Sequence, residues 1–214
     1  MEFLVNPSVL IPRPETELVV EAALDLARKH FSAEQRIRIA DVGTGSGCIA
    51  VALAKELPRA GVYALDQSPE ALGTARRNAQ RLGVEARVTF ILSDLLHPCE
   101  GEGLPELDMV VSNPPYVAER EKARIEREVR DFEPPAALFA GESGGDIYAR
   151  LIPQAAKAMP SGGHLVLELG YDSERCVGSL LQPTEWDNLR WSNDLAGIVR
   201  VVTARRVPAI GKST

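Results

Sequence analysis

The chain has 214 residues, 45% hydrophobic and 25% charged, which is enough for one well-buried domain and few for two. Its net charge of −6 argues against a general electrostatic grip on nucleic acid. The three cysteines form no CxxC pair and the three histidines are scattered, so we expect free thiols and no metal site. No apolar run approaches the roughly 18 residues that span a membrane, and no signal-peptide pattern is present. We therefore expect a cytoplasmic protein without a membrane partner.

Helix-like and strand-like segments alternate along the sequence. Helical composition is found in residues 17–30, 48–57, 69–82, 145–158 and 172–181. Strand-like apolar runs are found in residues 37–42, 61–65, 87–92, 107–112, 164–169, 189–192 and 197–204. Ser68 is expected to cap the third helix and Pro69 to occupy its first turn. This alternation predicts an α/β fold with a mostly parallel sheet of seven strands and helices on both faces.

The residues best suited to bind a ligand or to take part in a reaction all follow predicted strands. They are the glycine loop 43–47, Asp66, Asp94 and Asn113. In parallel sheets ligands bind beyond the carboxyl ends of the strands, so we expect these residues to share one site.

The glycine loop belongs to the segment Asp41-Val42-Gly43-Thr44-Gly45-Ser46-Gly47, between the first strand and a helix. Its glycines can take positive φ and let the backbone approach a ligand, and the helix N-terminus favours negative charge. A dinucleotide is one possible ligand, because residues 45–50 match the looser GxGxxA pattern. The sequence offers no clear hydride-transfer residues to support it. With its acid ahead of the glycines, the segment instead resembles the first motif of S-adenosylmethionine-dependent methyltransferases.

Two carboxylates follow the next two strands. Asp66 could accept both hydroxyls of a ribose, although it could also only help to start the turn before the third helix. Asp94 could accept the amino group of an adenine, with Leu95 packed on the ring, although ordinary loop chemistry explains both residues as well.

The fourth strand leads into Asn113-Pro114-Pro115-Tyr116. Asn113 offers a carboxamide oxygen and Pro114 a backbone carbonyl, and two prolines hold these acceptors stiffly. Tyr116 offers a flat face for a planar group. The segment therefore suits the holding of a planar amino group, with a plain Pro-Pro turn as the simpler alternative. The charged stretch 119–133 that follows is typical of a solvated helix, and its position also makes it a candidate lid.

With these motifs in this order, the chain resembles class I methyltransferases that act on exocyclic or amide nitrogen. Residues 10–17 (LIPRPETE), 131–134 (DFEP) and 194–202 narrow the resemblance to the HemK/PrmC-type release factor glutamine N5-methyltransferases. It covers nearly the whole chain, and the pairing of PRPETE with NPPY is highly specific. Members usually carry a helical N-terminal domain before this point, so the resemblance implies a catalytic domain that lacks it.

The resemblance implies a Rossmann-like class I fold and an enzyme that methylates the glutamine of the Gly-Gly-Gln loop in class I peptide chain release factors. S-adenosylmethionine would be the cofactor and S-adenosylhomocysteine the product. It implies that residues 1–34 pack on the cofactor cleft of a single catalytic domain, residues 35–214. The residues that it implies for the cofactor are Gly43, Thr44, Gly45, Ser46, Gly47, Asp66 and Asn113. The strand-end positions of Asp41, Asp94 and Leu95 add these three residues to the expected cofactor site. For the substrate and its chemistry it implies Asn113, Pro114, Pro115 and Tyr116, with Arg13, Thr16 and Glu17 nearby.

Three alternatives stay open at this point. NPPY would also suit a flipped base, so an amino methyltransferase for adenine N6, cytosine N4 or guanine N2 is the nearest rival, against which the acidic charge argues. Glutamine methylation of a ribosomal protein is a second, and a non-catalytic cofactor-binding scaffold is a third. Many family members have an aromatic residue where this chain has Leu95, which weakens ring stacking on adenine.

Overall fold

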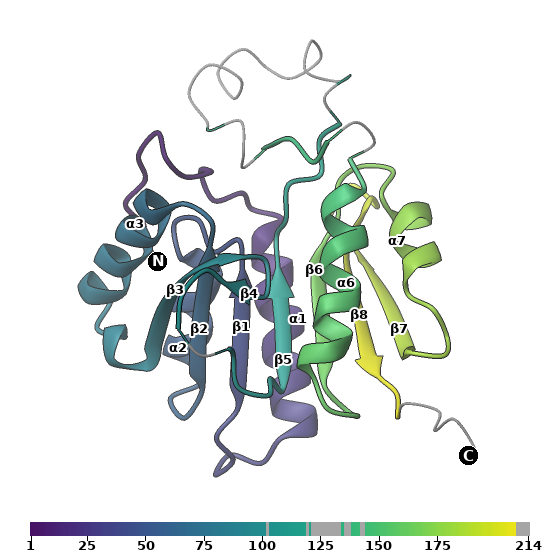
Figure 1. The fold of residues 1–214 in the computed structure, drawn as a ribbon, viewed down its shortest axis with the longest axis horizontal. Coiled ribbons are helices and arrows are strands. Elements are labelled where there is room, and N and C mark those ends of the chain that lie inside the picture. Colours follow the sequence, from purple (N-terminus) through teal and green to yellow (C-terminus); the bar gives the residue numbers. More distant parts are fainter. Residues whose placement is uncertain (102, 119, 121–133, 135–137, 142–143, 209–214) are drawn as a thin grey trace.

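The computed structural model describes residues 1–101, 103–118, 120, 134, 138–141 and 144–208 (Figure 1). Within these residues eight strands form one sheet, in the order β4-β3-β2-β1-β5-β6-β8-β7. The strands are β1 (Arg38–Val42), β2 (Gly61–Asp66), β3 (Val88–Asp94), β4 (His97–Pro98), β5 (Met109–Ser112), β6 (His164–Glu168), β7 (Trp186–Asn193) and β8 (Val199–Arg206).

The five central strands are parallel, and β8 and β7 close one edge in antiparallel pairing. This confirms the predicted mostly parallel sheet, with one correction to the strand count. The added strand, β4, has two residues and pairs antiparallel with the end of β3. A two-residue strand that contains a proline shows no readable periodicity, so the sequence could not reveal it.

Five helices and one 3₁₀ turn are described. They are α1 (Thr16–His30), α2 (Cys48–Glu56), α3 (Pro69–Arg81), the 3₁₀ turn η1 (Glu85–Arg87), α6 (Asp146–Ala158) and α7 (Glu174–Leu180). In Figure 1, α6 and α7 cover the near face of the sheet and α1 and α2 lie behind it. Helices on both faces confirm the predicted layers, and α3 begins as predicted, with the Ser68 hydroxyl accepting the N–H of Ala71 at 3.1 Å.

The core follows from the two-residue period of the strands. Ile39 and Val62 belong to the cluster under α1, α2 and α3, whereas Ala40 and Leu65 belong to the cluster under α6 and α7. Each central strand is therefore buried on both sides, which explains its continuous apolar sequence.

The strand order reverses between β1 and β5, because β2 and β3 lie to one side of β1, whereas β5 and β6 lie to the other. The Ser112 hydroxyl at the end of β5 donates to the carbonyl of Val42 at the end of β1, at 2.7 Å. The glycine loop after β1 and the NPPY segment after β5 thus start side by side. A reversal of this kind opens a crevice at the carboxyl ends of the strands.

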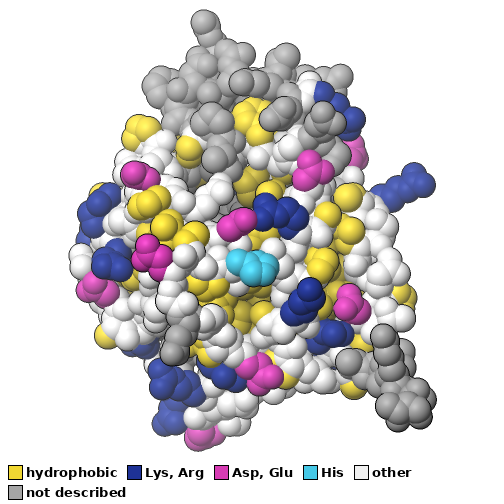
Figure 2. All heavy atoms as spheres, viewed as in Figure 1, with side chains coloured by type: hydrophobic (Ala, Val, Ile, Leu, Met, Phe, Trp, Pro, Cys, Tyr) yellow, Lys and Arg dark blue, Asp and Glu magenta, His cyan; other side chains and the backbone are white. Residues whose placement is uncertain are grey.

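Acidic and basic side chains are intermixed on the face seen in Figure 2, and hydrophobic groups lie scattered among them. Among the described residues, no helix is both long and apolar enough to cross a bilayer, and no cluster of three or more potential metal ligands is found. Apart from Arg120, the charged stretch 119–133 lies outside the described residues, as does 131–133 of the DFEP motif. The helix and lid predictions for that stretch stay predictions, as does the division of the chain at residue 34.

Candidate active site

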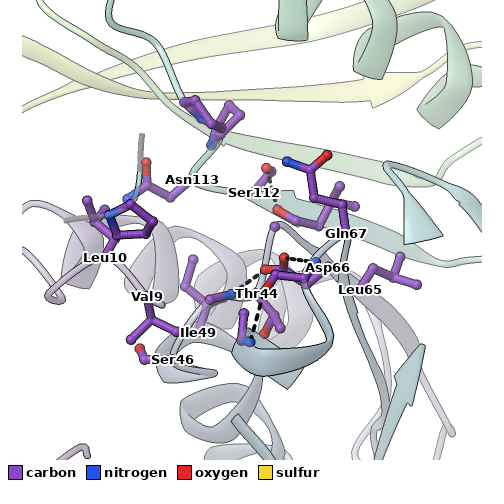
Figure 3. Close-up of a pocket in the computed structure, with 18 of the residues that line it drawn as sticks. Val9, Leu10, Thr44, Ser46, Ile49, Leu65, Asp66, Gln67, Ser112 and Asn113 are labelled. Carbon is purple, nitrogen blue, oxygen red and sulfur yellow. Dashed lines mark hydrogen bonds between the residues drawn. The ribbon is translucent and has the colours of Figure 1, made fainter. Parts of the chain in front are cut away.

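A cavity of about 590 Å³ lies at the carboxyl ends of the strands. Its walls come from the loops after β1, β2, β3 and β5, from the start of α6, and from the N-terminal segment that includes residues 8–12. In Figure 3, Asn113 and Leu10 lie on one side of this pocket, and Asp66 and Gln67 lie on the other. The topology thus brings together residues from at least six parts of the sequence.

The glycine loop has the backbone that its sequence predicts. Gly43, Gly45 and Gly47 have φ values of 71°, 53° and 81°, in the left-handed region that side chains disfavour. A Cβ on Gly47 would lie 2.9 Å from the Cβ of Ala75 in α3, so this glycine also permits close helix packing. Gly43, Thr44, Gly45 and Ser46 line the pocket, whereas Gly47 is not among the described residues of its wall.

Asp41 lies beneath the loop and is fully buried. Its Oδ2 accepts hydrogen bonds from the Thr44 hydroxyl at 2.6 Å and the Ala50 N–H at 3.0 Å. No partner is found among the described residues for Oδ1, and burial raises the pKa of Asp41 to about 7. The side chain therefore braces the loop from below, and the described pocket wall does not include it. The expected part of Asp41 in cofactor binding therefore stays a prediction.

Asp66 reaches the pocket from the end of β2. Its Oδ2 accepts the N–H of Gly45 and its Oδ1 accepts the N–H of Ser68, both at 2.9 Å. Burial raises the pKa of Asp66, and these hydrogen bonds oppose the rise. The two carboxylate oxygens can accept about four hydrogen bonds between them, so the carboxylate keeps acceptor capacity for a ligand hydroxyl.

Asp94 and Leu95 form the third wall. Asp94 accepts a hydrogen bond from Arg150 of α6 at 2.5 Å, in an ion pair whose members are both about half exposed. Leu95 has a φ of 55°, and its carbonyl accepts the Ser93 hydroxyl at 2.7 Å. Left-handed backbone is strained for leucine, and such strain is concentrated at functional sites. Arg150 was not predicted from the sequence, because its place at the site depends on how α6 packs.

The NPPY segment divides between the pocket and the core. Asn113, Pro114 and Pro115 line the pocket, as the sequence predicts. Tyr116 does not belong to the described pocket wall. Its ring instead packs on Gly170, where a Cβ would lie 2.5 Å from the ring carbon Cδ2, and burial raises its pKa. A stacking role for Tyr116 therefore stays a prediction that the packing of the ring does not favour.

The N-terminal segment is fastened to the sides of the site. Leu4 exchanges two backbone hydrogen bonds with the side chain of Asn78, at 2.8 and 2.9 Å, and the Asn78 amide also donates to the carbonyl of Ser46 at 2.8 Å. Thr16, at the start of α1, lines the pocket. Arg13 and Glu17 are not part of the described pocket wall, and Glu17 is exposed.

One buried acid beside the site was not predicted from the sequence. Glu168, the last residue of β6, is 1% exposed, and its Oε2 accepts the Thr16 hydroxyl at 2.8 Å. Burial raises the pKa of Glu168 to about 7. It carries the same signal as Asp66, an acid at the carboxyl end of an apolar strand, and could have been found by it.

Comparison with known proteins places this geometry in a class. Residues 19–130 match the family model described as the methyltransferase small domain. The crystal structure of a methyltransferase from Pyrococcus furiosus superposes with a TM-score of 0.64 over 96% of this chain and 88% of that one, at 15% identity. The family model and the shared architecture together place the chain among methyltransferases with the class I S-adenosylmethionine-dependent fold.

Two curated relatives narrow the class. The release factor glutamine methyltransferase of Koribacter versatilis is 50% identical over 205 residues, which are 96% of this chain and 70% of the relative. That of Geobacter sulfurreducens is 43% identical over 205 residues, 96% of this chain and 68% of the relative. The chain belongs to the release factor glutamine methyltransferase family.

The site residues fit the cofactor that methyltransferases of this class use. The Asp66 carboxylate keeps acceptor capacity beside its backbone hydrogen bonds, which suits the hydroxyls of a ribose. The left-handed glycines leave the loop after β1 without side chains at Gly43 and Gly45, and an added Cβ at Gly43 would meet no atom within 4 Å. A ligand can therefore come close to this backbone.

Proposed function

We propose that this chain transfers a methyl group from S-adenosylmethionine to the N5 amide nitrogen of the glutamine in the Gly-Gly-Gln loop of class I release factors. One observation carries the proposal. Asn113 and Pro114, two acceptors suited to a carboxamide, line the same 590 Å³ pocket as the glycine loop and Asp66. The names of the relatives support the choice of acceptor.

The cofactor would be held by the walls after β1, β2 and β3. In this proposal the loop 43–47 surrounds the methionine part, Asp66 binds the ribose hydroxyls, and Asp94 accepts the adenine amino group. Leu95 packs on the ring, and Asp41 supports the loop electrostatically. S-adenosylmethionine, when bound, supplies an electrophilic methyl group on a sulfonium centre.

The chain's own contribution is to orient a poor nucleophile. An amide nitrogen is weakly nucleophilic because its lone pair is delocalised into the carbonyl. Asn113 Oδ1 and the Pro114 carbonyl accept the two N–H groups of the glutamine, which aims the nitrogen toward the methyl donor. Such positioning contributes up to roughly 7–11 kcal/mol in favourable cases, and fixed acceptors stabilise the charge that develops on nitrogen. No strong base is required, because the alkylated amide is acidic enough to lose its proton to water.

The remaining predicted residues complete the proposal. Pro115 and Tyr116 shape the glutamine pocket, Tyr116 from its place on Gly170. Arg13 and Glu17 contact the protein substrate beside the pocket, and residues 1–34 close over the cofactor cleft as a part of one catalytic domain.

An acceptor assay tests the proposal. Labelled S-adenosylmethionine is offered with a class I release factor, a ribosomal protein or DNA, and the modified peptide is located by mass. We expect label only on the Gly-Gly-Gln glutamine, with a release factor whose glutamine is replaced as the control. Label on the ribosomal protein or on DNA, with none on the release factor, would overturn the assignment.

A further inference from the structure

The buried acid at the end of β6 lies beside the proposed catalytic amide. β5 and β6 pair in parallel with Ser112 opposite Leu167, so Asn113 and Glu168 are the next residues of the two strands. The Glu168 carboxylate is 1% exposed, and a buried charge is costly unless hydrogen bonds compensate it. The mechanism above assigns no task to this side chain.

A short chain of hydrogen bonds links the two residues through α1. Asn113 Nδ2 donates to Thr16 Oγ1 at 3.1 Å, and Thr16 Oγ1 donates to Glu168 Oε2 at 2.8 Å. The Asn113 side chain also forms a hydrogen bond that favours the charged form of Glu168. In its interactions with Thr16 and with Glu168, the Asn113 side chain donates through its NH2 group.

The direction of these hydrogen bonds follows from which groups can donate and which can accept. Above its raised pKa of about 7 the Glu168 side chain is ionised and can only accept, so the single proton of the Thr16 hydroxyl then points to Glu168. The lone pairs of the Thr16 oxygen are then left for a donor, and Asn113 can supply one only through Nδ2. Asn113 Oδ1 is thereby left for the pocket, which Asn113 lines.

We propose that Glu168, acting through Thr16, is a positioning residue that holds the Asn113 carboxamide with Oδ1 toward the substrate. The two faces of a carboxamide have nearly the same shape, so sterics alone select poorly between its orientations. A flipped Asn113 would set its own NH2 against the NH2 of the glutamine, two donors without an acceptor. The inference rests on the proposed function for its catalytic meaning, but the orientation of Asn113 can be measured without a substrate.

The other end of Glu168 is also held in place. The Tyr148 hydroxyl of α6 donates to the main-chain carbonyl of Glu168 at 2.8 Å, and Tyr148 is fully buried. The strand end is thus fixed from the face opposite to α1. A rigid support is what a positioning residue needs, because small displacements of an acceptor lower its effect.

The kinetic test compares Thr16→Val, which keeps the shape of threonine without a hydroxyl, with Thr16→Ser, which keeps the hydroxyl. We expect Thr16→Val to lower kcat on a release factor roughly 10- to 100-fold, in line with the loss of a charge-assisted hydrogen bond. KM and the Kd for the cofactor should change less than about threefold, since no binding contact of the proposal is removed. Thr16→Ser should restore kcat to within about threefold of wild type, and Thr89→Val, at an exposed site on β3, is the matched control.

A double-mutant cycle locates the effect in the chain of hydrogen bonds. Glu168→Gln can present either an oxygen or an NH2 to Thr16, so it should lower kcat in the wild-type background. It should lower kcat clearly less in the Thr16→Val background than in wild type, because the link through Thr16 is already broken and only the direct interaction of Asn113 with Glu168 remains. Additive losses, a wild-type kcat for Thr16→Val, or a Thr16→Ser variant as slow as Thr16→Val would each overturn the inference.

A spectroscopic readout separates this inference from the proposed function. The side-chain NH2 signals of Asn113, assigned by their loss in Asn113→Asp, should exchange slowly with water in wild type and Thr16→Ser and faster in Thr16→Val. If wild type leaves the release factor unmodified while this pattern holds, the function fails and the positioning role stands. Equal exchange in all three proteins would overturn the positioning role whatever the activity.

Discussion

The two ends of β6 bury titratable side chains of opposite kinds. At the amino end, His164 is 3% exposed, and its ring centroid lies 4.6 Å from that of His30 and 6.1 Å from that of Phe31. Burial lowers the pKa of His164 to about 4. At the carboxyl end, burial raises the pKa of Glu168 to about 7. In each case the uncharged form gains relative to the charged one.

The surroundings of these two side chains differ, and the difference indicates which end of the strand contributes to activity. His164 packs against other rings, a contact that serves stability. Glu168 is held by directional hydrogen bonds beside a cavity, as is Asp41 under the glycine loop. Perturbed acids at a pocket are typical of functional sites. Changes at the carboxyl end should therefore alter activity, and changes at the amino end should alter stability alone.

The largest effect is expected from Asn113→Ala, which tests directly whether activity depends on the carboxyl end of the sheet. Loss of the carboxamide acceptor should lower kcat on a release factor roughly 100- to 1000-fold, the range known for removal of one fixed transition-state hydrogen bond. His164→Phe, at the other end of the sheet, should keep kcat within about twofold. Steady-state kinetics on both proteins measure the contrast, and near-wild-type turnover by Asn113→Ala would contradict it.

The next effect concerns the packing beneath the pocket. Gly47→Ala combines a φ of 81° with a Cβ that would meet Ala75 at 2.9 Å, so it should destabilise the protein by roughly 2–4 kcal/mol. Gly83→Ala is a matched control, because its φ is 72° and nothing lies within 4 Å of an added Cβ. It should cost only about 1 kcal/mol. Urea unfolding measures both, and equal losses would show that the contact with α3 is unimportant.

Glu168 and His164 should also give the stability of the protein opposite dependences on pH. The raised pKa of Glu168 gives a stabilising contribution that is complete below its ordinary value of 4.5 and is lost as the pH rises through about 7. The lowered pKa of His164 gives a contribution that is present above 6.5 and is lost as the pH falls through about 4. The two trends oppose each other. The charge of Glu15 raises the pKa of Glu168 further, and the charge of Arg200 lowers it.

Single substitutions separate the two trends. Between pH 5 and 7, the stability of Glu168→Gln relative to wild type should rise with pH, and that of His164→Phe should fall. Each relative change should be on the order of 1–2 kcal/mol. Unfolding curves at several pH values give the slopes, and parallel slopes for the three proteins would show that neither group titrates differently in the folded state.

The smallest effect is expected at the mouth of the pocket. The ion pair of Asp94 and Arg150 is about half exposed at both side chains, and such pairs contribute less than about 1 kcal/mol. Arg150→Ala should therefore leave stability nearly unchanged and alter the cofactor Kd by less than about fivefold. Calorimetric titration at low and high salt checks this, and a large, salt-independent loss of affinity would assign Arg150 a direct contact.

Much of the fold could be predicted because glycines and prolines mark its boundaries. Strands β1 and β2 and helices α2 and α3 have observed bounds within about two residues of the predicted ones. β7 is longer than predicted, since it begins at Trp186 rather than 189. Its first part contains Asp187 and Asn188, which read as turn residues. Asn188 has a φ of 50°, and the pairing with β8 shifts register there, so a bulge hides the strand.

The site was predictable where backbone geometry decides and less so where packing decides. The glycine loop, Asp66 and Asn113 come to one pocket because all follow parallel strands. The place of Tyr116 could not be predicted, because it depends on the bare backbone of Gly170 on another strand end. Arg150 is likewise delivered by a helix from far along the chain.

The amide of Asn78 joins the N-terminal segment to the glycine loop, since it bonds both Leu4 and Ser46. Ordering of either partner therefore favours ordering of the other. Occupancy of the pocket should be felt at the edge of the molecule as slower hydrogen exchange at the Leu4 amide, although this residue does not line the cavity. Ligand binding in the pocket could thus be followed by hydrogen exchange at Leu4, a residue that takes no part in the reaction.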